Sequence, residues 1–148
     1  MDELEKLRKH WQDDDFQRKH ALAREIVVNR LRELNREYEE KTGQGFVRFI
    51  ETRMKTPESI AEKLQRKDYD VDFDTAVTAL NDISGVRCIC YSVKEIYWIA
   101  RQIGKTDTYT VVKAKDYIRK PKKNGYPGRN VRFYSAVEEF DAEYPLSF

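Results

Sequence analysis

The sequence predicts an α+β domain in which helices cover the faces of a small, mixed, mainly antiparallel sheet. Three patterns predict it. From about Phe16 to Lys41, apolar residues recur with the period of an amphipathic helix. Residues 86–91 form an apolar run with the two-residue period of a strand. Ser92 and Glu95 then make a capping box for a further helix, which ends at Gly104.

The N-terminal region is predicted to be helical. Met1 to Gln12 favours a short helix, and the longer helix follows it. Trp11 and Phe16 are expected to fold a helical cap or make a subunit contact rather than bind a base. The apolar side of the long helix is predicted to contain Leu22, Ile26, Val27, Leu31, Leu34 and Tyr38.

The next elements are an extended segment and a second helix. Gly43 to Gly45 break the helical pattern, and residues 46–54 are mainly extended. Thr56 is suited to an N-cap and is followed by proline, which fits the first helical position. We therefore expect a helix from Pro57 to about Arg66, with one core for the chain of 148 residues and a single domain over 1–148.

Asp74 is predicted to cap a short helical turn that ends near Leu80. After the strand at 86–91, the core face of the next helix is expected to consist of Ile96, Ile99, Ala100 and Ile103. Residues 109–115 favour another strand, and the alternation over 131–137 predicts the last one.

Composition restricts the functional classes. Net charge is only +2 although 36% of the residues are charged, so local cationic patches matter more than the overall field. This balance argues against a general nucleic-acid coat, which usually has a stronger excess of cations. The N-terminus is charged and no apolar run approaches the length of a membrane span, so we expect a soluble, cytoplasmic protein with no membrane partner.

The cysteines and histidines give no metal site. Cys88 and Cys90 are too close on one strand face for an unstrained disulfide, and they are expected to be buried reduced thiols. His10 and His20 lie in highly charged helical sequence without a partner at metal-ligand spacing. Both histidines are predicted to be surface residues.

A first cluster of polar residues surrounds the start of the second helix. Arg53 and Lys55 end the extended segment, and Ser59 and Lys63 lie one turn apart on one helix face. The orphan N–H groups and dipole of a helix N-terminus favour anions, so this arrangement is suited to polyphosphate. A solvated basic helix remains the alternative.

A second cluster stands where a loop becomes a strand. Asp82 precedes the strand, and Gly85 allows close backbone approach, which makes the aspartate a candidate Mg²⁺ ligand. The planar guanidinium of Arg87 can stack on a base. An arginine paired with a carboxylate at a strand end is the alternative.

A third cluster spans residues 116–126 and combines four cations, an Asn-Gly turn and two tyrosines. Its members include Lys122, Asn124 and Tyr126. The alternative is an ordinary cationic hairpin loop, since Asn-Gly is a common turn signal.

The order of these clusters, R-x-K-x-x-x-S-x-x-x-K, D-I-S-G-V-R and D-Y-I-x-x-P-K-x-N-G-Y, resembles the synthetase domain of RelA/SpoT-type alarmone enzymes. The short chain is most similar to the small alarmone synthetases, and the resemblance runs from about Phe16 to Tyr126. It implies a nucleotidyltransferase-like fold and transfer of pyrophosphate from ATP to the 3′-hydroxyl of GTP or GDP. The product is (p)ppGpp, the signal of the stringent response, and such synthetases tend to be homo-oligomers.

The resemblance also implies roles for individual residues. Arg53 and Arg87 would sandwich the adenine of ATP. Asp82 would be the catalytic carboxylate that holds Mg²⁺ against the phosphates. The residues that would bind those phosphates are Lys55, Ser59 and Lys63. Tyr126 would stack on the guanine of the acceptor, with Lys122 and Asn124 beside that nucleotide.

After Tyr126 the sequence departs from the family pattern. The R-S-x-H-like segment and the E-x-Q-x-R strand motif are missing, and no glutamine follows Gln102. Glu138, Glu139 and Glu143 are present but lie outside that motif. We therefore expect residues 127–148 to be a divergent tail, as after a frameshift or truncation, a sheet incomplete at its C-terminal end, and weak turnover. A catalytically inactive nucleotide-binding remnant and an RNA-binding module remain alternatives.

Overall fold

The computed structural model describes residues 2–80, 82–103, 105, 113–116, 130–134 and 138–143. Within these ranges the chain forms, in order, α1 (Glu3–Trp11), α2 (Asp14–Thr42), β1 (Val47–Met54), α3 (Pro57–Arg66), α4 (Phe73–Ala79), β2 (Ser84–Cys90), α5 (Val93–Ile103), β3 (Lys113–Asp116), β4 (Asn130–Tyr134) and β5 (Glu138–Glu143). No helix among these residues is both long enough and apolar enough to cross a bilayer.

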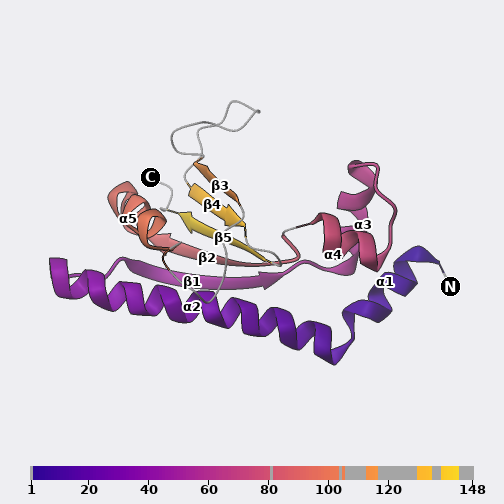
Figure 1. Ribbon diagram of the computed structural model, residues 1–148, viewed down its shortest axis with the longest axis horizontal. Helices are drawn as coiled ribbons and strands as arrows, with labels where there is room; N and C mark the ends of the chain where they lie inside the picture. The colour runs from indigo at the N-terminus through magenta and orange to yellow at the C-terminus, as the bar shows by residue number, and fades with distance from the viewer. Residues whose placement is uncertain are drawn as a thin grey trace.

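The strands form one sheet in the order β1-β2-β5-β4-β3 (Figure 1). β2 runs parallel to β5, and the other neighbouring pairs are antiparallel. This arrangement confirms the predicted mixed, mainly antiparallel sheet. The last strand expected over 131–137 is β4, whose described residues end at Tyr134, and the sequence patterns did not predict β5. Of the strand expected over 109–115, residues 109–112 lie outside the described residues.

One face of the sheet packs against α2 and α5. Its core contains Val27, Leu31, Leu34, Tyr38, Phe46, Val86, Cys88, Cys90, Ile96, Ile99 and Ile103. Cys88 and Cys90 are buried free thiols, as predicted. The apolar side predicted for α2 was wrong for two residues, because Leu22 is 53% exposed and Ile26 is 38% exposed.

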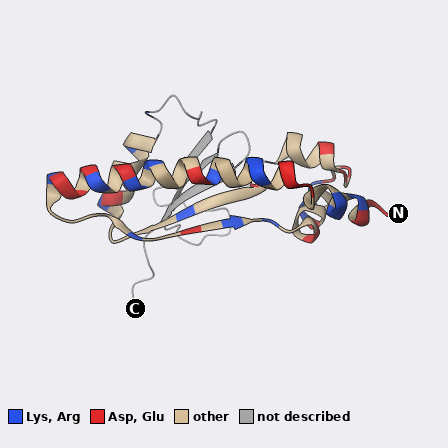
Figure 2. Cartoon of the chain, turned by 90° about the horizontal axis from the view of Figure 1, so that it is seen from below, with Lys and Arg blue, Asp and Glu red and all other residues tan. Residues whose placement is uncertain are grey.

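The buried residues of α2 explain this correction. His20, Val27, Leu31, Leu34 and Tyr38 recur at spacings of seven, four, three and four residues, which keeps them on one stripe. Leu22 and Ile26 lie off that stripe. Cationic and acidic residues are interspersed along most of α2 (Figure 2).

A second core lies at the other end of the molecule, where α1, α3 and α4 gather beside the start of α2 (Figure 1). Its buried residues are Leu7, Trp11, Ile60, Ala61, Leu64, Ala76, Leu80 and Ile83. The ring of Phe16 lies 4.9 Å from that of Trp11 and 5.1 Å from that of Phe73. Trp11 and Phe16 therefore fold a helical cap, as one of the two predicted alternatives stated.

The helix caps are set by short polar side chains. Thr56 accepts a hydrogen bond from the Ser59 N–H, as predicted for the N-cap of α3. Glu95 accepts from the main-chain N–H of Ser92, which is one half of the predicted capping box. The prediction for α4 was wrong: Asp72, rather than Asp74, is its N-cap and accepts from the Thr75 N–H. Asp74 lies within the first turn of α4.

Candidate functional site

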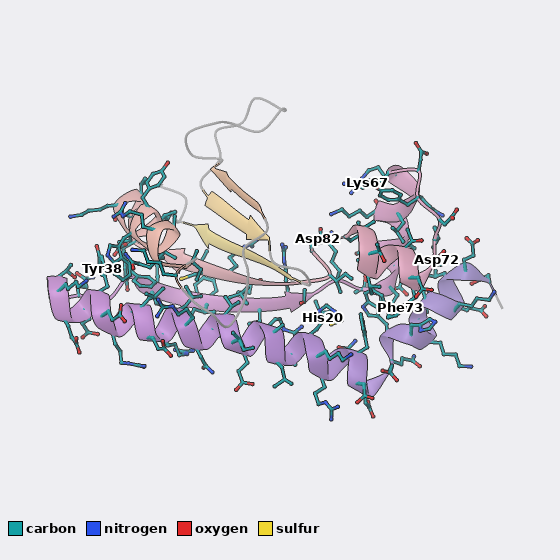
Figure 3. All side chains as sticks on the ribbon, viewed as in Figure 1. His20, Tyr38, Lys67, Asp72, Phe73 and Asp82 are labelled. Carbon is teal, nitrogen blue, oxygen red and sulfur yellow. The ribbon has the colours of Figure 1, made fainter. Side chains whose placement is uncertain are left out.

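Three charged side chains from separate elements meet at the junction of the two cores. Lys55 follows β1, Lys63 lies on α3, and Asp82 directly precedes the segment that enters β2. The Nζ atoms of Lys55 and Lys63 each lie 2.5 Å from Oδ2 of Asp82. We call these three residues the lysine–aspartate triad. Figure 3 shows Asp82 at the end of the sheet, facing the α3–α4 pair.

Local structure brings the triad together. The main-chain N–H of Lys55 donates to the Ile83 carbonyl at 2.7 Å, which joins the end of β1 to the segment that carries Asp82. Burial of Ile60 and Leu64 fixes the rotation of α3. The i, i+4 spacing then places Ser59 and Lys63 on one side of that helix, with Ser59 exposed in the first turn.

The triad is held by strong local electrostatics. Burial of Asp82 would by itself raise the pKa of its carboxyl, but hydrogen bonds from Lys55 and Lys63 outweigh this effect and lower it. Burial lowers the pKa of Lys55 despite the opposing hydrogen bond from Asp82, and the positive charges of Lys63 and Arg53 act in the same direction as burial. Two ammonium groups face one carboxylate, so the triad has an excess positive charge that suits an anionic ligand.

The other oxygen of Asp82 supports the predicted metal role. Oδ1 is buried and has no hydrogen-bond partner among the described residues. A buried carboxylate oxygen without a donor is energetically unfavourable and suits a hard cation that brings its own further ligands. No group of three or more metal-ligating side chains occurs within the described part of the chain. Asp82 can therefore be one ligand of a Mg²⁺ ion whose other ligands come from water and phosphate.

Arg53 and Arg87 lie on adjacent strands beside the triad. Arg53 is paired with Gly85, and Arg87 is paired with Glu51. Arg53 and Arg87 are thus diagonal neighbours on one face of the sheet, opposite the face that buries Val86 and Cys88. Diagonal neighbours are roughly 7–8 Å apart. At this spacing both arginine side chains can reach one ligand on that face of the sheet.

The register of β5 places two consecutive glutamates beside the start of β2, shortly after Asp82. Glu138 is paired with Ser84, and Glu139 is paired with Gly85. Because Gly85 is also paired with Arg53, these backbone positions form one row across three strands: Arg53, Gly85 and Glu139. The tail that departs from the family motif therefore supplies the strand beside β2. The predicted acceptor residues Lys122, Asn124 and Tyr126 lie outside the described residues.

His20 corrects a prediction and adds a residue that sequence reasoning missed. It is only 4% exposed, whereas we expected a surface residue. Its Nδ1 lies 2.9 Å from Ser84 Oγ, two residues after Asp82 (Figure 3). Its spacing of seven residues from Val27 puts both on one helix face, and this was the sequence signal for the burial of His20. His10 is exposed, and its ring stacks on Phe73 with a centroid distance of 4.4 Å.

The sequence model of a protein family described as "Region found in RelA / SpoT proteins" matches residues 52–143. The match begins within β1 and ends with the last residue of β5, beyond the Tyr126 at which the motif resemblance stops. The chain belongs to this family.

Two curated relatives come from Bacillus subtilis (strain 168). GTP pyrophosphokinase YwaC is 31% identical over 126 residues, which cover 85% of this chain and 59% of that protein. GTP pyrophosphokinase YjbM is 29% identical over 104 residues, which cover 70% of this chain and 48% of that protein. The chain spans about half to three-fifths of the length of these relatives.

Solved structures agree with the fold. The small alarmone synthetase 2 of Bacillus subtilis superposes with a TM-score of 0.68 at 25% identity, covering 90% of this chain and 72% of that chain. The small alarmone synthetase 1 of the same species, bound to its product pppGpp, gives a TM-score of 0.72 at 23% identity, covering 89% and 74%. These likenesses confirm the predicted synthetase-type fold.

The burial of His20 generates a prediction about pH. Burial, followed by the charge of Arg24, lowers the pKa of this imidazole below its ordinary 6.5. The unfolded chain therefore takes up a proton below about pH 6.5 that the folded chain resists, and stability falls as pH drops through this range. The free energy of unfolding, measured by denaturant titration from about pH 7 to pH 5, should fall less steeply for His20→Gln than for the native chain.

His10→Gln is the matched control, because His10 is exposed and is the only other histidine in the chain. It should keep the native slope. Equal slopes for His20→Gln and the native chain would contradict the assignment of His20 as a buried neutral imidazole.

Proposed function

We propose that this chain acts as a GTP pyrophosphokinase, which transfers pyrophosphate from ATP to the 3′-hydroxyl of GTP or GDP and forms (p)ppGpp. The observation that supports this proposal most directly is the lysine–aspartate triad, in which two ammonium groups share one buried carboxylate. Lys55 directly precedes the N-cap of α3, and Lys63 lies in the last turn of that helix. Membership of the RelA/SpoT family and the activity named for YwaC support it.

The triad is the nucleotide-free arrangement of a phosphate site. Lys55 and Lys63 neutralise Asp82 while no nucleotide is present. The phosphates of ATP carry more negative charge than one carboxylate, so both ammonium groups exchange Asp82 for phosphate oxygens. The Ser59 hydroxyl adds a hydrogen bond to the same anion, whereas the Ser59 N–H is already bonded to Thr56 and Pro57 has no N–H. Asp82 would then be the residue that holds Mg²⁺, and the ion would supply charge neutralisation and orientation of the phosphates.

Adenine is placed between Arg53 and Arg87. Their diagonal register on one sheet face supports a sandwich of the ring by two guanidinium groups. Arg53 is two residues from Lys55, so the base site and the phosphate site are continuous along the end of β1. Acceptor binding by Lys122, Asn124 and Tyr126 stays a prediction from the family resemblance.

The transfer step requires positioning and charge stabilisation rather than a protein nucleophile. A bond forms between the acceptor 3′-oxygen and the β-phosphorus of ATP. The bond from that phosphorus to the oxygen bridging the α-phosphate breaks, AMP leaves, and the hydroxyl proton passes to a base. Lys55 and Lys63 stabilise the negative charge on the phosphate oxygens during this step.

Glu139 is the proposed base. The E-x-Q-x-R motif is absent from the sequence, yet β5 lies parallel to β2 at its side and places Glu139 in the same row as Gly85 and Arg53. This register supports Glu139 as a carboxylate-bearing residue in the row beside which the nucleotide is proposed to bind.

The adenine site can be tested by Arg87→Ala. One cation–π stack contributes roughly 0.5–2 kcal/mol, so the substitution should weaken Mg·ATP binding by up to about thirtyfold without unfolding the domain. Calorimetry measures the affinity. Arg48→Ala is the control, because Arg48 is an exposed arginine of the same strand as Arg53. Unchanged ATP affinity in folded Arg87→Ala would remove this residue from the site.

The metal role can be tested by Asp82→Asn. ATP affinity of the native chain should rise strongly with Mg²⁺ concentration, because Asp82 and the phosphates together bind the ion, and this dependence should be largely lost in Asp82→Asn. Asp70→Asn, an exposed aspartate in the turn after α3, should behave as the native chain. The same Mg²⁺ dependence in all three proteins would exclude Asp82 as a ligand.

Turnover tests the proposal as a whole. Purified protein with Mg²⁺, ATP and GTP or GDP should form pppGpp or ppGpp slowly, because the E-x-Q-x-R motif is missing from its sequence. Glu139→Gln should lower the rate by a further factor of about 10² to 10⁴, as is typical for loss of a general base, and Glu143→Gln, at the far end of β5, should not. Chromatography resolves the nucleotide products.

Two results would contradict this function. Saturable Mg·ATP binding with no product would favour the inactive nucleotide-binding remnant. No ATP binding, together with RNA binding that weakens steeply with salt, would favour the RNA-binding module.

A further inference from the structure

Trp11 is far from the triad in the sequence but contacts it directly. Its indole Nε1 donates a hydrogen bond to the main-chain carbonyl of Lys55 at 2.8 Å. The Trp11 side chain is only 5% exposed. A buried indole N–H needs an acceptor, and here the acceptor belongs to the residue whose ammonium group holds Asp82.

Both main-chain polar groups of Lys55 are held by hydrogen bonds, and the bond from Trp11 is one of them. The N–H of Lys55 donates to Ile83 O at 2.7 Å, and its carbonyl accepts from Trp11. Lys55 lies between the end of β1 and the N-cap of α3, so neither a strand ladder nor a helix holds both of its main-chain groups. Its peptide is held on one side by the segment that carries Asp82 and on the other by α1. The direction of the Lys55 side chain depends on both bonds.

Trp11 is itself rigidly held. Its ring packs 4.9 Å from Phe16, and its own carbonyl accepts from Gln17 Nε2 at 2.7 Å. The Arg8–Glu58 ion pair at 2.7 Å also joins α1 to α3. These side chains are 46% and 52% exposed, so the pair contributes little to the stability of that contact. Aromatic packing and the indole hydrogen bond are therefore the contacts that hold α1 against Lys55.

We propose that Trp11 is a positioning residue that directs the Lys55 ammonium group through the hydrogen bond from its indole N–H to the Lys55 carbonyl. The group is directed to Asp82 in the nucleotide-free protein. It is directed to the ATP phosphates in the complex, and only this second part rests on the proposed function.

Trp11→Phe isolates this role. The substitution keeps an aromatic ring among Phe16 and Phe73 but removes the N–H donor together with part of the indole volume, and the control below carries the same loss of volume. Trp98→Phe is the matched control. It changes the second of the two tryptophans of the chain, which lies in the other core with its ring 5.0 Å from that of Tyr38.

The first measurement is independent of ATP. Lys55 is labelled with an amine-acylating ester and its rate of modification is measured by mass spectrometry, with the exposed Lys67 as internal reference. In Trp11→Phe the ammonium group spends less time paired with Asp82, so Lys55 should react about two- to tenfold faster, as expected for loss of one hydrogen bond. Trp98→Phe should label at the native rate. Unchanged Lys55 labelling in folded Trp11→Phe would overturn the proposal.

The second measurement is a double-mutant cycle on Mg·ATP affinity. Trp11→Phe should weaken binding about two- to tenfold when Lys55 is present and should have no further effect in Lys55→Ala, because Trp11 acts through Lys55. Additive effects would show a merely structural role and would overturn the ATP part of the proposal. If the native chain does not bind Mg·ATP, the proposed function fails, and the labelling result alone decides the role of Trp11.

Discussion

The contact of two ammonium groups with one oxygen of Asp82 is the interaction on which the rest of the site depends. It joins β1, α3 and the segment before β2, which would otherwise carry unpaired charges at a partly buried junction. Pairing lowers the pKa of Asp82 against the effect of burial, so the carboxylate stays ionised at neutral pH. Oδ1 is buried and has no hydrogen-bond partner among the described residues, which is the observation behind its proposed role as a metal ligand.

Two apolar cores hold this junction from opposite sides. Ile60 and Leu64 fix α3 in the smaller core, and Val86 and Cys88 fix β2 in the larger one. Both cores are apolar and buried, whereas the triad between them is ionic. In the function proposed above, a nucleotide would draw the lysines away from Asp82 and change the charge pairing without unpacking either core.

Local signals in the sequence predicted much of this structure. Thr56 and its following proline fixed the start of α3, and the i, i+4 spacing of Ser59 and Lys63 placed both on one helix face. Non-local features were not predicted. His20 was missed because a histidine on a charged helix resembles a surface residue, and only its spacing to Val27 reveals the buried stripe. The direct pairing of the lysines with Asp82 depends on where the tertiary structure places α3 relative to the segment that enters β2. Residues 139–143 of β5 do alternate polar and apolar, but the strand is short and four of its six residues are acidic, a class that is depleted in strands. Its place beside β2 therefore follows from the sheet rather than from its sequence.

The most direct test of this account is a pair of crystal structures, one without nucleotide and one with Mg²⁺ and a non-hydrolysable ATP analogue. The account predicts that the Nζ atoms of Lys55 and Lys63 contact Asp82 in the first structure and phosphate oxygens in the second, where Asp82 binds the metal. A complex in which the analogue is bound elsewhere while the lysine–aspartate triad stays intact would contradict the central claim.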